Sequence, residues 1–321
     1  MTFIASVIAK EGVAIIADSL VTTSKPVIGW NDFMNFLRAK NEALGGGEEE
    51  ISFTQSEVVD LFKLTDSHTR NYEDKLFKLD KYTAITTTGI AVLNSKRMAK
   101  VISEFRDLKE WDNVPLEQKV AEFSAFLTVE IKSHLGSSNM DSLRFIMTHY
   151  DVNEEKTTCY NFFTGNMDAT SLEIPDFPYV ATIISHELYK VVTGGQNRIS
   201  DKILLGNFLD KTKEILPQLI SKVCDDLGFD KGKVTADYIK GFEFGEQFND
   251  AILGDMEVFN ISPLSLQQAV DLAWLLMRLE TDFQKYTREI PTVGGVIKLA
   301  TINKEGFKFI SGHEVTLPTA L

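Results

Sequence analysis

The first nineteen residues, MTFIASVIAKEGVAIIADS (Met1 to Ser19), are the stretch that decides the fold. Two apolar runs rich in β-branched residues, Phe3 to Ala9 and Val13 to Ala17, flank Lys10-Glu11-Gly12. A glycine in so short a connection can take the positive φ that a tight turn needs. The pattern therefore predicts a β-hairpin that begins at residue 3.

This hairpin brings two reactive groups to one edge. Thr2 lies at the open end of its first strand, and Asp18 follows the end of the partner strand. Once Met1 is removed, Thr2 carries a free α-amine whose pKa is near ~8, so the amine can accept the proton of the attacking hydroxyl. The sequence thus predicts that Thr2 is a catalytic residue. The alternative is that Met1-Thr2 only precedes a strand that pairs in a sheet.

Composition limits the possible partners. The chain has 321 residues, 44% of them hydrophobic, and a formal net charge of -13. The length favours one domain, and the charge repels phosphate backbones and acidic lipids, so we expect no nucleic-acid and no membrane partner. Cys159 and Cys224 have no second Cys or His at ligand spacing. We therefore expect no disulfide, no metal and no cofactor.

Targeting signals are also not expected. No apolar run reaches the ~18 residues that a membrane helix needs. The N-terminus lacks the basic, apolar and small-residue pattern of a secretory signal peptide. Together with the cysteine usage, this predicts a cytoplasmic protein.

The regular pattern breaks down between Leu20 and Asp74, around a Gly45-Gly46-Gly47 triplet that three glutamates follow. Such a stretch buries poorly, so residues 20–74 are predicted to be an exposed insertion with a short helix over Asp32 to Ala39. Both a solvated loop and a lid or partner-binding flap remain open for its role.

A second hairpin is predicted from Lys75 to Leu79 and from Tyr82 to Thr88, because charged and apolar residues alternate there. The remaining periodicity predicts, in chain order, helices over Ala91 to Lys109 and Leu116 to Leu135, strands over Leu143 to Tyr150, Thr157 to Phe163, Tyr179 to Ser185 and Leu188 to Val192, helices over Asp201 to Leu227, Thr235 to Asn249 and Leu266 to Tyr286, and strands over Val296 to Ile302 and Phe307 to Ser311. This order predicts an α+β fold with two antiparallel sheets between helical layers.

Four residues stand at distinctive places in this order: Thr2, Asp18 after the second strand, Lys75 at the third strand, and Gly89 after three threonines. Together they resemble the catalytic framework of the proteasome β-subunit family of N-terminal nucleophile (Ntn) hydrolases, including its bacterial threonine peptidases. The spacings from Thr2 to Asp18 and from Lys75 to Gly89 match without a gap. The resemblance implies a four-layer αββα sandwich, Thr2 as nucleophile, Asp18 and Lys75 as the charged pair beside it, and the Gly89 N–H as an oxyanion-hole donor.

Other positions depart from the family pattern. The turn Gly294-Gly295 is similar to the family's Gly-Gly turn, but Val293 precedes it where the family has Ser, and Thr292 lies one residue earlier. Ile290 falls where the family has an acid. The family's other active-site Ser falls on Gly194. These departures predict altered specificity or lost activity.

The favoured hypothesis is a threonine hydrolase that cuts amide bonds, mainly of peptides, inside a homo-oligomeric ring. A small-molecule amidase with an open site and a proteasome-like assembly or binding subunit without activity are the alternatives. We also expect that replacing Thr2 or Lys75 leaves stability nearly unchanged, because residue 2 precedes the first strand and a strand-edge lysine packs little.

Overall fold

The computed structural model describes residues 2–43, 52–70, 72–168, 170–171, 181–185, 190–196, 199–200, 222, 224, 228, 263–286 and 291–312. The helices predicted over Asp201 to Leu227 and Thr235 to Asn249 lie, apart from Lys222 and Cys224, outside these ranges. Within them, no helix is both long and apolar enough to cross a membrane.

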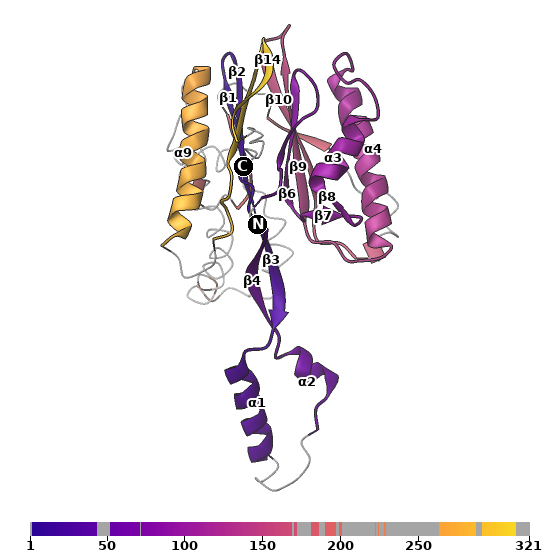
Figure 1. Cartoon of the computed structure of the whole chain (residues 1–321), viewed down its shortest axis with the longest axis vertical. Coiled ribbons are helices and arrows are strands. Elements are labelled where there is room, and N and C mark those ends of the chain that lie inside the picture. The colour runs from indigo at the N-terminus through magenta and orange to yellow at the C-terminus, as the bar shows by residue number, and fades with distance from the viewer. Residues whose placement is uncertain are drawn as a thin grey trace, which may run out of the picture.

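The N-terminal hairpin, labelled β1 and β2 in Figure 1, forms part of a five-stranded antiparallel sheet in the order β12-β1-β2-β13-β14. The predicted hairpin forms, with Ile4 opposite Ala17 and Ala9 opposite Gly12, so Gly12, which was expected in the connection, begins the second strand. Every residue of the two hairpin strands is buried, as expected for inner strands covered on both faces. The strands are β1 (Phe3–Ala9), β2 (Gly12–Ala17), β12 (Val191–Gly195), β13 (Lys298–Asn303) and β14 (Gly306–Ser311).

The second hairpin belongs to another five-stranded antiparallel sheet, in the order β11-β10-β9-β6-β5. Its members are β5 (Leu76–Lys78), β6 (Thr83–Gly89), β9 (Leu143–Asp151), β10 (Lys156–Thr164) and β11 (Ala181–Ser185). The prediction of an α+β fold with two antiparallel sheets is confirmed.

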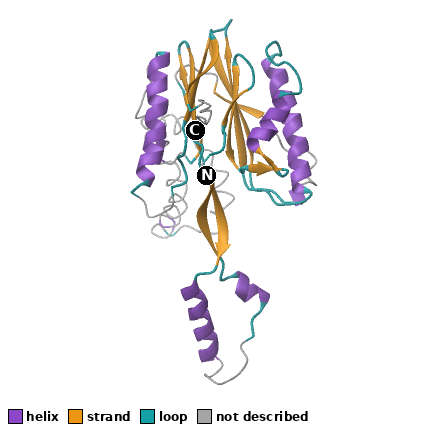
Figure 2. Ribbon diagram, viewed as in Figure 1, coloured by secondary structure: helices purple, strands orange, loops and turns teal. Residues whose placement is uncertain are grey.

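Helices cover the outer faces of the two sheets, which face each other (Figures 1 and 2). Helix α9 (Leu266–Gln284) packs on the first sheet, and its buried Ala273 and Met277 meet side chains of β1 and β2. Helices α3 (Met98–Arg106) and α4 (Leu116–Leu135) pack on the second sheet through an aromatic core that includes Phe105 and Phe123. A third apolar core lies between the sheets, with Ile4, Ile15, Ile146 and Ala300 among its members.

The helix predicted over Ala91 to Lys109 is wrong in its first half. Asn94 and Ser95 have φ values of 50° and 61°, and they connect the short strands β7 (Val92–Leu93) and β8 (Lys96–Arg97). Positive φ at both central residues is the geometry of a two-residue hairpin turn, which asparagine tolerates well. Because of this turn, the helix begins at Met98 and not at Ala91.

The prediction for β12 is also wrong in its boundaries. The strand includes Gly194 and Gly195, which were expected to follow it, and these glycines pair with Ile4 and Phe3. A Cβ on Gly194 would lie 3.0 Å from the Ile4 side chain, and one on Gly195 would lie 1.9 Å from the Thr2 carbonyl oxygen. The two glycines therefore allow close approach of strands rather than a turn.

The predicted insertion forms an arm that projects from the body (Figures 1 and 2). Strands β3 (Val21–Val27) and β4 (Lys63–Arg70) pair as an antiparallel ribbon, and the helices α1 (Trp30–Ala43) and α2 (Gln55–Val59) lie beyond it. Neither helix buries a residue. The ribbon was not predicted, and the helix is longer than Asp32 to Ala39.

A buried polar cluster connects α4 to the second sheet. Lys119 Nζ lies 2.6 Å from Asp80 Oδ2 and donates to Thr83 Oγ1 at 3.2 Å, and that hydroxyl is 2.9 Å from His149 Nδ1. Burial lowers the pKa of His149 below its usual 6.5, and the charge of Lys119 adds to this, while Asp80 opposes it. The neutral imidazole is therefore the form that the folded state favours.

This lowered pKa predicts a stability change with pH. Below pH 6.5 His149 takes up a proton in the unfolded chain, but in the folded protein it does so only at a lower pH. Acidification therefore lowers the free energy of unfolding until the pH falls below the folded-state pKa of His149. We expect the free energy of unfolding, measured by urea titration, to fall between pH 7 and pH ~5.5. In His149→Gln the fall should be smaller, and an equal fall in both proteins would show that other groups cause it.

Candidate functional site

The backbone of Thr2 is held firmly beside β12. Its carbonyl oxygen accepts a hydrogen bond from the Gln196 N–H at 2.5 Å. Gly195 lies against the same carbonyl with φ +83°, a conformation that other residues rarely adopt. The Thr2 residue is only 4% exposed, so the expectation that residue 2 buries little is wrong.

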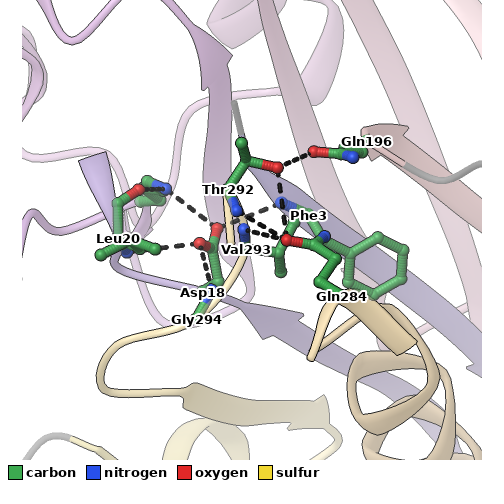
Figure 3. Close-up of polar contacts among 9 residues, drawn as sticks. Phe3, Asp18, Leu20, Gln196, Gln284, Thr292, Val293 and Gly294 are labelled. Carbon is green, nitrogen blue, oxygen red and sulfur yellow. Dashed lines mark hydrogen bonds and ion pairs between the residues drawn. The ribbon is translucent and has the colours of Figure 1, made fainter. Parts of the chain in front are cut away.

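Asp18 is 1% exposed and accepts three backbone hydrogen bonds. Its Oδ1 accepts from the Phe3 N–H at 3.1 Å, and its Oδ2 accepts from Leu20 at 3.3 Å and from Gly294 at 3.1 Å (Figure 3). This carboxylate therefore joins the open ends of β1 and β2 to the turn that precedes β13.

Lys75 completes the charged pair. Its Nζ lies 2.9 Å from Asp18 Oδ1 and donates to the Leu20 carbonyl oxygen at 2.6 Å. The residue is 6% exposed, so its interpretation as an exposed strand-edge lysine is wrong. Its carbonyl oxygen accepts from the Thr87 N–H at 3.0 Å, which continues the pairing of β5 with β6.

Burial and pairing act on these two charges in opposite directions. Burial lowers the pKa of Lys75, and the Asp18 carboxylate opposes this. Burial raises the pKa of Asp18, while Lys75 and the N–H donors of Gly294 and Phe3 oppose it. A buried pair persists when hydrogen bonds satisfy both groups, as they do here. Burial thus favours the neutral forms of both groups, and their 2.9 Å contact and hydrogen bonds oppose it.

Thr2, Lys75 and Gly89 line one small pocket, of about 20 Å³. That volume holds about one water molecule. Asp18 does not line the pocket, but it contacts two residues that do, Lys75 and Leu20. The first and last residues of the insertion, including Leu20 and Glu73, form part of the same wall. Three of the four predicted site residues are therefore brought together at the root of the arm.

The position of Gly89 requires glycine. It ends β6 with φ +100°, and a Cβ there would lie 2.1 Å from the Ser142 carbonyl oxygen. We expect Gly89→Ala to lower the free energy of unfolding by at least about 1 kcal/mol, because an L-residue is strained at this φ.

Gly165→Ala is the matched control for that substitution, because no atom lies within 4 Å of a Cβ built at Gly165. Urea titration of the control should give a result close to wild type. Gly89→Ala with wild-type stability would show that this position tolerates a Cβ.

Two glutamines, Gln196 and Gln284, cluster around Thr292 and were not predicted as site residues. The N–H groups of Thr292 and Val293 donate to Gln284 Oε1 at 2.6 and 3.2 Å. The Thr292 hydroxyl donates to Gln196 Oε1 (Figure 3). One signal was present, since Gln284 continues the buried stripe of α9 seven residues after Met277.

The chain matches no family model and no curated protein. Among the described residues, no group of three or more His, Cys, Asp and Glu side chains could hold a metal ion. The residues of the pocket and the polar groups that hold them are therefore the features of this chain that bear on its function.

Proposed function

We propose that this protein is an Ntn hydrolase that uses Thr2, freed by removal of Met1, to cleave amide bonds, with peptides as the main substrates. The observation that carries the proposal is the buried Asp18–Lys75 pair at a pocket that Thr2 and Gly89 also line. The succession of α9, two facing sheets and the α3–α4 pair supports the four-layer αββα sandwich of that class.

The reaction would proceed in two steps. The Thr2 hydroxyl oxygen bonds to the substrate carbonyl carbon, and its proton passes to the α-amine of the same residue. The negative charge that forms on the carbonyl oxygen is stabilised by the N–H of Gly89. The C–N bond then breaks, the leaving amine takes the proton, and water hydrolyses the ester that remains on Thr2.

Lys75 has an electrostatic role in this scheme. A positive charge held beside Thr2 disfavours a second one, so it lowers the pKa of the α-amine and keeps that amine able to accept a proton. The same charge stabilises the negative charge that develops on the hydroxyl oxygen during attack. Asp18 keeps the ammonium group in place.

A second candidate is a proteasome-like subunit that assembles or binds but does not cut. It is favoured by Gly194 and Val293, which stand where the resembled family has hydroxyl groups. A small-molecule amidase is a variant of the main proposal. Native mass separates the two enzymes, because a peptidase in a closed ring would be a homo-oligomer and an open amidase a monomer near 36.0 kDa.

The test compares protein with and without Met1 on fluorogenic peptide amides. Because the α-amine of Thr2 forms a peptide bond while Met1 is present, we expect turnover only after its removal. The N-terminal mass identifies the form in each sample. Equal turnover in both forms would remove the amine from the mechanism, and no turnover in either would favour the subunit without activity.

A further inference from the structure

We propose that Gln284, on the outer helix α9, is a positioning residue for both Thr2 and the Asp18–Lys75 pair. The proposal rests on the proposed function and identifies what holds its reactive groups in register. Gln284 is 7% exposed and ends the helix that packs on the outer face of the first sheet. It does not line the pocket, so its effect on the reaction must pass through other residues.

The side-chain oxygen of Gln284 holds the backbone of residues 292 and 293. It accepts from the Thr292 N–H at 2.6 Å and from the Val293 N–H at 3.2 Å, and the Thr292 hydroxyl oxygen lies 3.4 Å away. Figure 3 shows these contacts meeting at a single amide oxygen. Thr292 and Val293 are themselves buried, so water does not replace this acceptor.

Two hydrogen bonds connect the segment that Gln284 holds to Thr2. The Thr292 hydroxyl has one proton, which it donates to Gln196 Oε1. The backbone N–H of Gln196 donates to the Thr2 carbonyl oxygen at 2.5 Å. A displacement of Thr292 therefore moves the residue that fixes the carbonyl of the nucleophile.

Gly294, the next residue of the same segment, connects it to the Asp18–Lys75 pair. The Gly294 N–H donates to Asp18 Oδ2 at 3.1 Å, and the Gly294 carbonyl oxygen accepts from the Ser19 and Leu20 N–H groups, both at 3.0 Å. The Leu20 carbonyl oxygen in turn accepts a hydrogen bond from the Lys75 ammonium group at 2.6 Å. One acceptor on α9 thus supports both halves of the site.

The experiment compares three variants of the protein without Met1. Gln284→Leu keeps most of the volume but leaves two buried N–H groups without an acceptor, and Gln284→Glu keeps an acceptor oxygen. Gln267→Leu is the matched control, because Gln267 lies on the same helix and its exposed side chain bonds only to Asp271 among the contacts of the described residues. Turnover of a peptide amide, thermal unfolding and the pKa of the Thr2 α-amine by ¹⁵N NMR are measured for each.

We expect Gln284→Leu to lower kcat by about 10²-fold with little change in KM, since misplacement of a reacting group by ~1 Å has an effect of that order. The pKa of the Thr2 amine should rise, because the lysine charge is no longer held at the same place. Gln284→Glu should recover most of kcat. Gln267→Leu should match wild type in all three measurements.

The outcomes separate this proposal from the proposed function. Wild-type kcat and an unchanged amine pKa in Gln284→Leu would overturn the positioning role while leaving the hydrolase intact. A Gln284→Leu protein that loses thermal stability but keeps its amine pKa would also overturn it, since the residue would then be structural only. If the wild-type protein has no turnover, the hydrolase proposal fails. The positioning role is then still supported if the pKa of the Thr2 amine shifts in Gln284→Leu and not in Gln267→Leu.

Discussion

Replacing Lys75 with methionine is expected to lower amide turnover by about 10³-fold, as for the loss of a group that stabilises charge in the transition state. The same change should lower the free energy of unfolding by about 3–5 kcal/mol, because it leaves the buried Asp18 carboxylate without its partner at 2.9 Å. Sequence reasoning expected almost no loss of stability, and the burial of the lysine corrects that expectation.

The control for this substitution is Lys63→Met on the arm. Lys63 also pairs with a carboxylate, Asp32 at 2.8 Å, but the two side chains are 67% and 41% exposed. Exposed pairs contribute about 0–1 kcal/mol, so turnover and urea titration should change little. A Lys75→Met protein with near-normal turnover would reduce Lys75 to a structural residue and remove the electrostatic part of the mechanism.

The second large effect is expected for Thr2→Ala, which should abolish amide turnover because no hydroxyl remains to attack. Thr2 is buried, so a loss of about 1 kcal/mol in unfolding free energy is expected in addition, within the usual range for a single substitution. Thr2→Ser keeps a hydroxyl and an amine and should retain measurable turnover. Fluorogenic peptide amides and urea titration check the two effects separately.

Residual turnover in Thr2→Ala equal to wild type would show that another group attacks the substrate. In that case the pocket would lose its assigned nucleophile, although the Asp18–Lys75 pair would keep its structural contribution. Loss of turnover in Thr2→Ser together with Thr2→Ala would instead show that the methyl group of threonine positions the hydroxyl.

The parts of the fold that the sequence predicted well have strong local patterns. The β1–β2 hairpin has two β-branched runs around a glycine, and α4 was predicted with the bounds observed, Leu116 to Leu135, because its apolar residues repeat at helical spacing. The arm was predicted as exposed but not as a ribbon. Strands β3 and β4 pair across 35 intervening residues, and neither has the alternation that a half-buried sheet imposes.

The site was predicted less completely than the fold. Thr2 and Asp18 are adjacent through a local hairpin, but Lys75 is 57 residues from Asp18, and only the resemblance to a known family connected the two. Nothing in the sequence indicated that Gln196 and Gln284 meet at Thr292, because their contacts depend on how three distant segments fold together. The strand predicted over Leu188 to Val192 stopped before the two glycines of β12, because glycine is uncommon inside strands except where two backbones approach closely.

The most direct test of the account is the mass of the Thr2 peptide after the protein without Met1 has reacted with a peptide epoxyketone. This reagent needs a hydroxyl and an amine on one residue to close its ring, so it reports both groups that the mechanism assigns to Thr2. The account predicts a single adduct, located on Thr2, that is lost in Thr2→Ala and strongly reduced in Lys75→Met. An unmodified Thr2, or an adduct at another residue, would contradict it.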